Sequence, residues 1–180
     1  HKHVPTAIAA PDFIDRLVVL TAASKTFNLA GLRTGNLIVP DAKLRTCLAS
    51  AISALDIQPN AFGVAVSTAV YSPEGAAWVD ALTAYLAENY EAFRAGLDTI
   101  PGVVVMPQPA TFLTWVAFFG TGLSPEEVHK RVTQDARIGP SPGAPFGTGG
   151  ERGLRFNIGT QRRIVDEAVA RLRTAFSDLG

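Results

Sequence analysis

The 180-residue sequence predicts an α/β protein, and three observations lead to this prediction. Short apolar runs alternate with longer stretches whose apolar residues recur every three or four positions, as in strands followed by amphipathic helices. Serine or aspartate precedes several of these stretches, where its side chain can cap a helix. Proline and glycine stand between the elements. We predict a part-domain over residues 1–72, a connecting helix over residues 73–99 and a small α+β domain over residues 100–180.

The first elements are two short apolar runs. Residues 16–21 (RLVVLT) are rich in β-branched side chains and bounded by polar ones, and residues 35–39 (GNLIV) end at a proline. Runs of this length and composition are typical of strands. We expect both to be buried strands, with the polar stretch of residues 24–34 (SKTFNLAGLRT) as the loop between them.

Three helices are expected next. Asp41 can cap the first, and a second helix should follow Pro59 and reach Val70. Ser72, followed by proline at the first helical position, predicts the start of a third helix that runs to about residue 98. Its apolar side chains repeat at helical spacing, at Trp78, Leu82, Tyr85, Leu86, Phe93 and Leu97.

The last part of the chain has a different pattern. Residues 103–106 and 111–119 are expected to be strands, separated by a Pro-Gln-Pro turn. Ser124 begins a capping box and should open a helix that ends near residue 136. Residues 139–150 (GPSPGAPFGTGG) form a loop, which is either a flexible surface loop or a segment that shapes the mouth of a site.

The sequence closes with a strand and a helix. Residues 154–159 are expected to form the strand, and Thr160 is expected to cap the helix that follows. Phe112, Trp115 and Tyr71 are interpreted as core residues rather than as contacts to a substrate or cofactor.

Composition excludes several classes of function. Lys and Arg number 16, as do Asp and Glu, so the net charge is zero and gives no electrostatic basis for binding nucleic acid or an anionic membrane. No apolar run reaches the roughly 18 residues of a membrane span, and no signal peptide follows the opening residues. The single cysteine, Cys47, excludes an internal disulfide and fits a reducing compartment, so we expect a cytoplasmic protein.

No metal-ligand pattern is present either. His1 and His3 have no carboxylate or cysteine partner nearby, and His129 falls on the polar face of a helix. The glycine-rich loop over residues 139–150 lacks a following Lys-Ser or Lys-Thr, so it is not a P-loop. We therefore predict a protein without a metal site.

The loop after the first strand holds the residues best placed for covalent chemistry. Partial desolvation of Lys25 there would lower the pKa of its amine and free it as a nucleophile for Schiff-base formation. Arg33, in the same loop, could bind a phosphate through paired charge-assisted hydrogen bonds. A lysine and an arginine in a loop are usually solvated, so from spacing alone that simpler interpretation is favoured and the functional one stays open.

Residues 21–40 (TAASKTFNLAGLRTGNLIVP) resemble the cofactor-lysine segment of fold-type-I pyridoxal-phosphate (PLP) enzymes. The form SKTFNLAGL is similar to that of the MalY/PatB-like cystathionine β-lyase (C–S lyase) branch, more than to the SKxxGxxGxR form of class I aminotransferases. Residues 1–7 (HKHVPTA) resemble the segment that follows the strand with the ring-binding aspartate. Residues 153–172 (GLRFNIGTQRRIVDEAVARL) resemble the arginine strand and final helix, so the resemblance covers nearly the whole chain.

This resemblance implies both a fold and a set of roles. The chain would be the C-terminal part of the PLP-dependent transferase fold: a remnant of the large α/β domain, a connecting helix and the small α+β domain. Lys25 would bind PLP and then act as general base and acid, while Arg33 and Ser24 would bind its phosphate. Arg155 would bind the α-carboxylate of an amino-acid substrate in a bidentate pair, although without the lysine segment a surface ion pair would be the simpler interpretation.

Some family features are missing from these residues. Ala22 replaces a serine that many aminotransferases place three positions before the lysine. The preceding half of the fold would supply a glycine-rich phosphate loop, an aromatic ring that stacks on PLP and an aspartate at the pyridine nitrogen. PLP needs that acidic partner to act as an electron sink, so we expect this chain alone to be inactive. The resemblance also implies that the full-length protein is a homodimer.

The implied function is PLP-dependent C–S β-lyase activity on cystathionine-like sulfur amino acids, giving a thiol, pyruvate and ammonia. An aminotransferase of class I or II is an alternative, because transamination uses the same residues up to the loss of the Cα proton. Two further alternatives are an aminotransferase-like effector domain of a transcription regulator and a stable remnant without activity.

Overall fold

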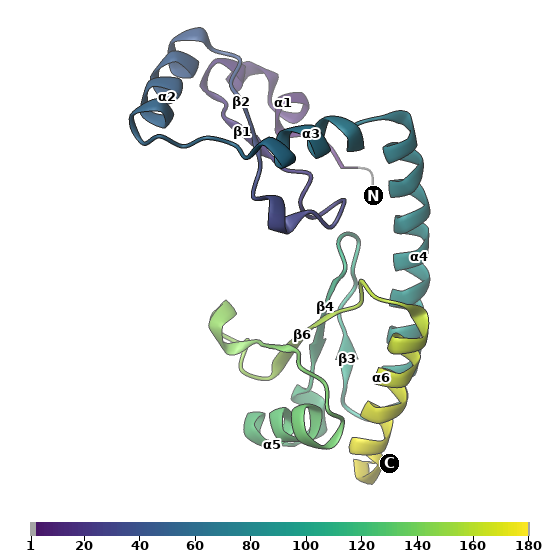
Figure 1. Cartoon of the computed structure of the whole chain (residues 1–180). Coiled ribbons are helices and arrows are strands. Elements are labelled where there is room, and N and C mark those ends of the chain that lie inside the picture. The colour runs from purple at the N-terminus through teal and green to yellow at the C-terminus, as the bar shows by residue number, and fades with distance from the viewer. Residues whose placement is uncertain (1–2, 180) are drawn as a thin grey trace. The chain divides into compact units, whose positions relative to one another are not determined.

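The computed structural model describes residues 3–179, which contain both helices and strands, and this confirms the predicted α/β class (Figure 1). The chain forms two compact units that divide between Ala81 and Leu82, inside helix α4 (Pro73–Leu97). His1 and Lys2, which open the first segment of family resemblance, lie outside the described residues. The two units are called the first unit and the second unit below.

The first unit contains a two-stranded antiparallel sheet whose strands are three residues long. Its register pairs Leu20 with Leu37. The elements of this unit are α1 (Thr6–Ala9), β1 (Val19–Thr21), β2 (Asn36–Ile38), α2 (Ala42–Ala54), α3 (Ala61–Val70) and the first turns of α4 (Pro73–Leu97).

The prediction that both strands of this sheet are buried is wrong. Leu20 is 74% exposed, and Ile38 is exposed as well. Among the described residues of the first unit, the only buried hydrophobic side chains are those of Ala23 and Val39, because the ribbon has no further layer packed over it. Tyr71, which was expected in the core, is 58% exposed for the same reason.

The predicted helix starts of the first unit are confirmed by their capping bonds. The Asp41 carboxylate accepts a hydrogen bond from the backbone N–H of Leu44 at 2.7 Å, which caps α2. The Ser72 hydroxyl accepts from the backbone N–H of Gly75 at 3.1 Å, at the start of α4. These are local interactions, so short-range sequence rules suffice to find them.

The second unit contains a four-stranded antiparallel sheet in the order β3-β4-β6-β5. The two-residue strand β5 was not predicted, because it lies inside the glycine- and proline-rich loop. The helix after Ser124 continues as a π-helical turn over Arg131–Asp135, so its predicted end near residue 136 is confirmed. The elements that follow α4 are β3 (Val104–Val105), β4 (Leu113–Ala117), α5 (Pro125–Lys130), β5 (Ser141–Pro142), β6 (Gly153–Asn157) and α6 (Arg162–Ala175).

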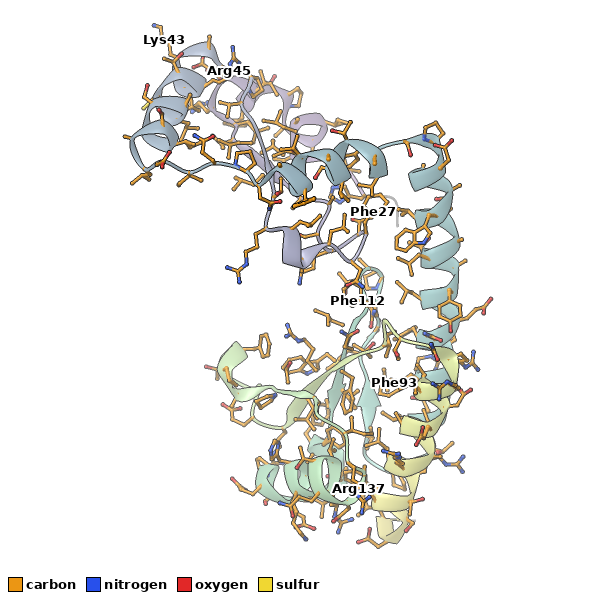
Figure 2. All side chains as sticks on the ribbon, in the orientation of Figure 1. Phe27, Lys43, Arg45, Phe93, Phe112 and Arg137 are labelled. Carbon is orange, nitrogen blue, oxygen red and sulfur yellow. The ribbon has the colours of Figure 1, made fainter. Side chains whose placement is uncertain are left out.

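Alternate residues of the central strands face a continuous core. Val116 of β4 and Leu154 and Phe156 of β6 are buried together in one cluster. Phe93 of α4 points into this cluster, with its ring centroid 5.4 Å from that of Phe156 (Figure 2). The second unit therefore has an interior of its own.

Helices α4 and α6 approach closely on one side of this core (Figure 1). A Cβ atom on Gly96 of α4 would lie 2.3 Å from a methyl carbon of Val169 of α6, a distance that real Cβ atoms do not reach. The absence of a side chain at Gly96 thus lets the two helices pack together.

The prediction that Thr160 caps α6 is wrong. The N-cap residue is Gln161, whose side chain makes no capping bond. Instead, the Tyr85 hydroxyl of α4 accepts a hydrogen bond from the backbone N–H of Arg162 at 2.6 Å. The carbonyl of Thr160 accepts from the buried side-chain amide of Asn89 at 2.9 Å. Partners from α4 therefore organise the start of α6.

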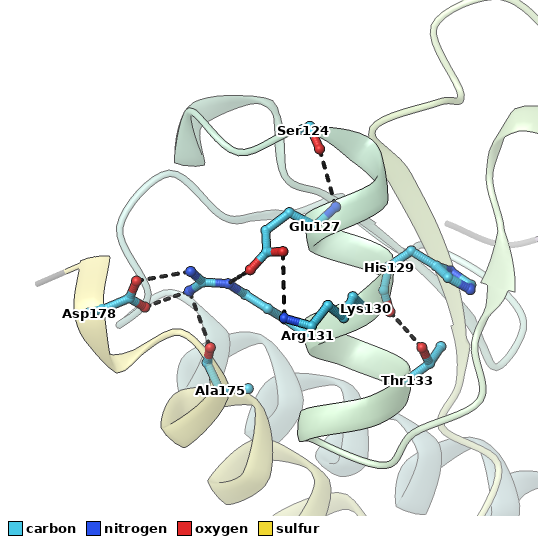
Figure 3. A network of polar contacts seen from close by, with 8 residues as sticks. All are labelled: Ser124, Glu127, His129, Lys130, Arg131, Thr133, Ala175 and Asp178. Atoms are coloured by element: carbon cyan, nitrogen blue, oxygen red, sulfur yellow. Dashed lines mark hydrogen bonds and ion pairs between the residues drawn. The ribbon is translucent and has the colours of Figure 1, made fainter.

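An arginine joins α5 to the end of the chain (Figure 3). Ser124 caps α5 as predicted, since its hydroxyl accepts from the backbone N–H of Glu127 at 3.2 Å. The guanidinium of Arg131 donates to the carboxylates of Glu127 and Asp178, each at 2.9 Å, and to the carbonyl of Ala175 at 3.3 Å. These bonds hold the pKa of both carboxyls below their ordinary values.

Candidate functional site

The predicted cofactor lysine lies in a turn directly after β1. Two backbone hydrogen bonds close this turn, from Phe27 N–H to the Ala23 carbonyl at 3.0 Å and from Leu29 N–H to the Ser24 carbonyl at 2.8 Å. Ser24 is half-buried and Lys25 is exposed. The partial desolvation that we expected for Lys25 is therefore not supplied by the described residues.

An aromatic cluster anchors this turn to the helices of the first unit. The ring of Phe27 stacks on that of Trp78, with centroids 5.6 Å apart and planes at 23°. Its edge contact with Tyr71 has a centroid distance of 6.1 Å and an angle of 82°. Phe27 thus fixes the turn two residues after Lys25, a role that sequence patterns did not reveal because its partners lie far along the chain.

The backbone at Arg33 is held in a left-handed conformation, with φ 46° and ψ 41°. The carbonyl of Leu32 accepts hydrogen bonds from the Thr34 hydroxyl at 2.9 Å and from the side-chain amide of Asn60. Asn60 also caps α3 by accepting from the backbone N–H of Gly63 at 2.7 Å. A non-glycine residue with positive φ is strained, and such strain clusters at functional sites. The start of α3 therefore positions the exposed Arg33.

Arg155 lies at the centre of a row across three strands of the second unit. The register places it opposite Trp115 of β4 on one side and opposite Ser141 of β5 on the other. One terminal nitrogen of its guanidinium donates to the Ser141 hydroxyl at 3.3 Å. The guanidinium carbon lies 4.7 Å from the centre of the Phe146 ring.

The charge of Arg155 is not balanced by a carboxylate among residues 3–179. Its Nε atom is buried and has no hydrogen-bond partner in the same stretch. Arg131 of the same unit is the opposite case, because two carboxylates and a carbonyl satisfy its guanidinium. Arg155 therefore retains the capacity to bind an anionic group through charge-assisted hydrogen bonds.

The predicted site residues fall into two groups. Ser24, Lys25 and Arg33 all belong to the first unit, on the segment that joins β1 to β2. Arg155 belongs to the second unit, with the row described above. The first group offers a primary amine, a hydroxyl and a guanidinium, and the second offers a guanidinium lined by aromatic rings.

Other kinds of site find no support among the described residues. Within residues 3–179, no three His, Cys, Asp or Glu side chains gather closely enough to hold a metal ion. No helix in this stretch has both the length and the apolar character that crossing a bilayer requires. Cys47 is exposed, and its thiol is not part of a disulfide.

Comparisons with known proteins agree with the segments singled out above. The family model described as Aminotransferase class I and II matches residues 3–172. Cystathionine beta-lyase PatB of Bacillus subtilis is 35% identical over 179 residues, which cover 98% of this chain and 46% of that protein. Protein MalY of Escherichia coli is 25% identical over 177 residues, which cover 96% of this chain and 44% of that protein. The chain thus spans about half the length of the curated relatives that it matches.

Solved structures show the same partial coverage. A PLP-bound protein of Clostridium difficile 630, named as a candidate aminotransferase, superposes with a TM-score of 0.89 and 31% identity over 98% of this chain and 46% of its own. Cystalysin of Treponema denticola, which contains PLP, gives a TM-score of 0.90 over 100% of this chain and 46% of its own. At 23% identity, this second match establishes the fold alone. The predicted C-terminal part of the transferase fold is confirmed.

Proposed function

Because the chain belongs to the class I and II aminotransferase family, we propose that it forms the lysine- and arginine-bearing half of a PLP-dependent C–S β-lyase. The substrate class is a cystathionine-like sulfur amino acid, which would yield a thiol, pyruvate and ammonia. The name and identity of the Bacillus subtilis relative support the lyase, together with the SKTFNLAGL form of the lysine segment.

The segment between β1 and β2 fits PLP chemically. PLP carries an aldehyde and a phosphate, and this segment carries an amine at Lys25, a guanidinium at Arg33 and a hydroxyl at Ser24. Neither cation pairs with a carboxylate among residues 3–179. We assign the aldehyde to Lys25 and the phosphate to Arg33, assisted by Ser24.

We also assign to Lys25 the transfer of the substrate Cα proton. When bound, PLP supplies an electron sink for the electron pair left at the substrate Cα. The Nζ of Lys25 takes the Cα proton as general base, and the resulting ammonium can return it as general acid. Lys25 is exposed among the described residues, so the proposal requires residues outside this chain to shield its amine from water.

The observation that carries the substrate assignment is the guanidinium of Arg155. It is half-buried, lacks a carboxylate partner among the described residues and has a buried Nε without an acceptor. Unsatisfied buried donors are rare, so a ligand that accepts from them is favoured. The α-carboxylate of an amino acid presents two oxygens that suit a bidentate pair with arginine, and this pair would fix the carboxylate end of the substrate.

The proposed elimination balances one proton and one electron pair. Lys25 removes the proton from Cα, a double bond forms between Cα and Cβ, and the Cβ–S bond breaks. The thiolate leaves with the electrons of that bond and takes up a proton, and one water hydrolyses the released 2-aminoacrylate to pyruvate and ammonia. Transamination would share the first step, in which Lys25 removes the Cα proton, and would differ in where Lys25 then delivers that proton. The same residues therefore serve the alternative of an aminotransferase, which the family description also favours.

Two assays of the longest reading frame that contains these 180 residues separate the lyase from the aminotransferase. With PLP and L-cystathionine, the lyase releases a thiol that a disulfide reagent detects and pyruvate that lactate dehydrogenase detects. With an amino acid and a 2-oxo acid, an aminotransferase exchanges the amino group. Thiol release establishes the lyase, and amino transfer without thiol release establishes the alternative.

The assignment of Lys25 has a separate test on the longest reading frame that contains this chain. PLP should give a Schiff-base absorbance band above 400 nm (about 420 nm) with the wild type, and Lys25→Ala should lose it. Lys43→Ala is a matched control, because Lys43 is an exposed lysine of the same unit on α2 (Figure 2). Equal loss of the band in both variants would show random modification of surface lysines and would count against Lys25.

A further inference from the structure

The face of the second-unit sheet that carries Arg155 also carries an aromatic wall. Along β6, Arg155 lies between Leu154 and Phe156, which are both buried in the core, so its side chain emerges on the opposite face. Trp115, directly opposite on β4, emerges on that same face. Phe146 covers both, since its ring lies 4.7 Å from the Arg155 guanidinium and 5.5 Å from the Trp115 ring.

Phe146 is held in this position by a tightly closed loop. Its backbone N–H donates to the Gly143 carbonyl at 2.9 Å. A Cβ atom on Gly143 would lie 2.1 Å from the Gly150 carbonyl oxygen, so Gly143 and Gly150 approach more closely than a side chain at position 143 would allow. The Trp115 ring meets the ring of Phe146 at 90°, an edge-to-face contact that aromatic pairs prefer. The conformation of the loop therefore holds the Phe146 ring against Trp115 and Arg155.

Burial in a core does not explain the place of this ring. Phe146 is 54% exposed and does not belong to the core cluster. Hydrogen bonds, in turn, do not explain the pose of Arg155, whose bond to the Ser141 hydroxyl is long at 3.3 Å and whose Nε has no partner among the described residues. The face of the ring lies within the distance at which a guanidinium is attracted to an aromatic ring.

We propose that Phe146 is a positioning residue that holds the Arg155 guanidinium in place for the substrate carboxylate. This inference rests on the proposed function and deepens it, because it names the residue that orients the carboxylate-binding group. A flexible arginine loses rotamer freedom when it grips a ligand, and a ring that restrains it beforehand lowers that loss. Of the two interpretations of the loop over residues 139–150, the structure favours the one in which it shapes the site.

A first test reads the guanidinium directly in the 180-residue chain. The ring current of Phe146 should shift the Arg155 Nε–H signal in the NMR spectrum, and ¹⁵N relaxation should report a restrained side chain. Phe146→Leu should move this signal and increase its fast motion, and Phe146→Tyr should restore both. Phe119→Leu is the matched control, since Phe119 is 55% exposed in the same unit. An unchanged signal in Phe146→Leu would overturn the proposal.

A second test uses turnover of L-cystathionine by the longest reading frame that contains this chain. Phe146→Leu should raise KM about 3- to 30-fold with little change in kcat, and Phe146→Tyr should recover most of it. A normal KM in Phe146→Leu beside a raised KM in Arg155→Ala would overturn the role of Phe146 and keep that of Arg155. Unchanged KM in both variants would overturn the assignment of Arg155 as well as the inference built on it.

Discussion

The two units of this chain differ in whether they possess a core. In the second unit, residues from α4, the sheet, α5 and α6 bury their side chains in one cluster. In the first unit, Ala23 and Val39 are the only buried hydrophobic residues that the structure describes, and most of the exposed large hydrophobic side chains of the chain are found here. Phe62 on α3 is an example, with 78% of its surface exposed.

This difference separates what forms an element from what stabilises a fold. Both units have capped helices and paired strands, so local interactions are sufficient to describe their elements. A two-stranded ribbon and short helices are marginal in water unless they bury an apolar face. The first unit therefore leaves an apolar surface uncovered among the residues that the structure describes, and its elements should be less stable than those of the second unit.

Hydrogen exchange on the 180-residue chain is the strongest way to break this comparison. Amides of β4, β6 and α6 should exchange on the order of a thousandfold more slowly than unprotected amides, because they open only with the core of the second unit. Amides of α2 and α3 should exchange within about tenfold of unprotected rates. Mass spectrometry of peptic fragments measures both. Equal protection of the two units would contradict the inference of an uncovered surface.

Matched phenylalanine truncations give the next largest effect. Phe156→Ala removes a buried ring that packs on Phe93, and it should lower the free energy of unfolding of the second unit by about 3–5 kcal/mol. Phe62→Ala removes an exposed ring in the first unit, and it should change the measured free energy of unfolding by less than about 0.5 kcal/mol. Denaturant unfolding followed by circular dichroism compares them, and similar losses in the two variants would refute the distinction between the units.

How far the sequence predicts this fold follows from the range of the interactions involved. Asp41, Ser72 and Ser124 were identified as helix caps because each binds a backbone N–H three residues ahead. The prediction that Thr160 caps α6 was wrong because the hydroxyl that accepts the hydrogen bond at the start of α6 belongs to Tyr85, far away in sequence. The prediction that β1 and β2 are buried was wrong because burial depends on which elements cover a strand, whereas the sequence pattern shows only which residues are apolar.

The candidate site shows the same limit. Lys25, Arg33 and Arg155 were named from local motifs, and each stays a prediction until it is tested. Phe146 was missed as an individual residue, because its contact with Arg155 depends on strand register and on a closed loop. Phe27 was missed because its partners come from helices that follow much later in the chain. Motifs identify reacting groups, whereas the residues that position them emerge from tertiary structure.

Two N-caps sharpen the comparison with a smaller effect. Ser124→Ala removes the cap of α5, and it should lower the free energy of unfolding of the second unit by about 1 kcal/mol. Asp41→Ala removes an equivalent cap from α2 in the first unit. It should leave the cooperative transition unchanged while it reduces helical signal, since α2 is not attached to a buried core. A shift of the transition by Asp41→Ala as large as that by Ser124→Ala would show that both units unfold together.

The smallest expected effect is a pH dependence confined to the second unit. The hydrogen bonds from Arg131 lower the pKa of Asp178 and Glu127 in the folded state below their ordinary values of 3.8 and 4.5. A lowered folded pKa contributes stability that is present above the ordinary value and is lost as the pH falls through the folded value. The thermal midpoint of the second unit should therefore decline below about pH 4.5.

Substitution of the arginine tests whether this contact is the cause. Arg131→Gln should lower the midpoint near neutral pH, and the difference from wild type should shrink as acid protonates both carboxylates. Arg163→Gln is the control, since this arginine of α6 bonds to a neutral glutamine, Gln161, and should leave the acid dependence in place. A gap between Arg131→Gln and wild type that stays constant with pH would mean that Arg131 stabilises through its packing on Phe176 instead. The contact of Arg131 with Glu127 and Asp178 would then stabilise the second unit only as part of its core packing. The charges of these residues would not contribute to the difference in stability between the two units.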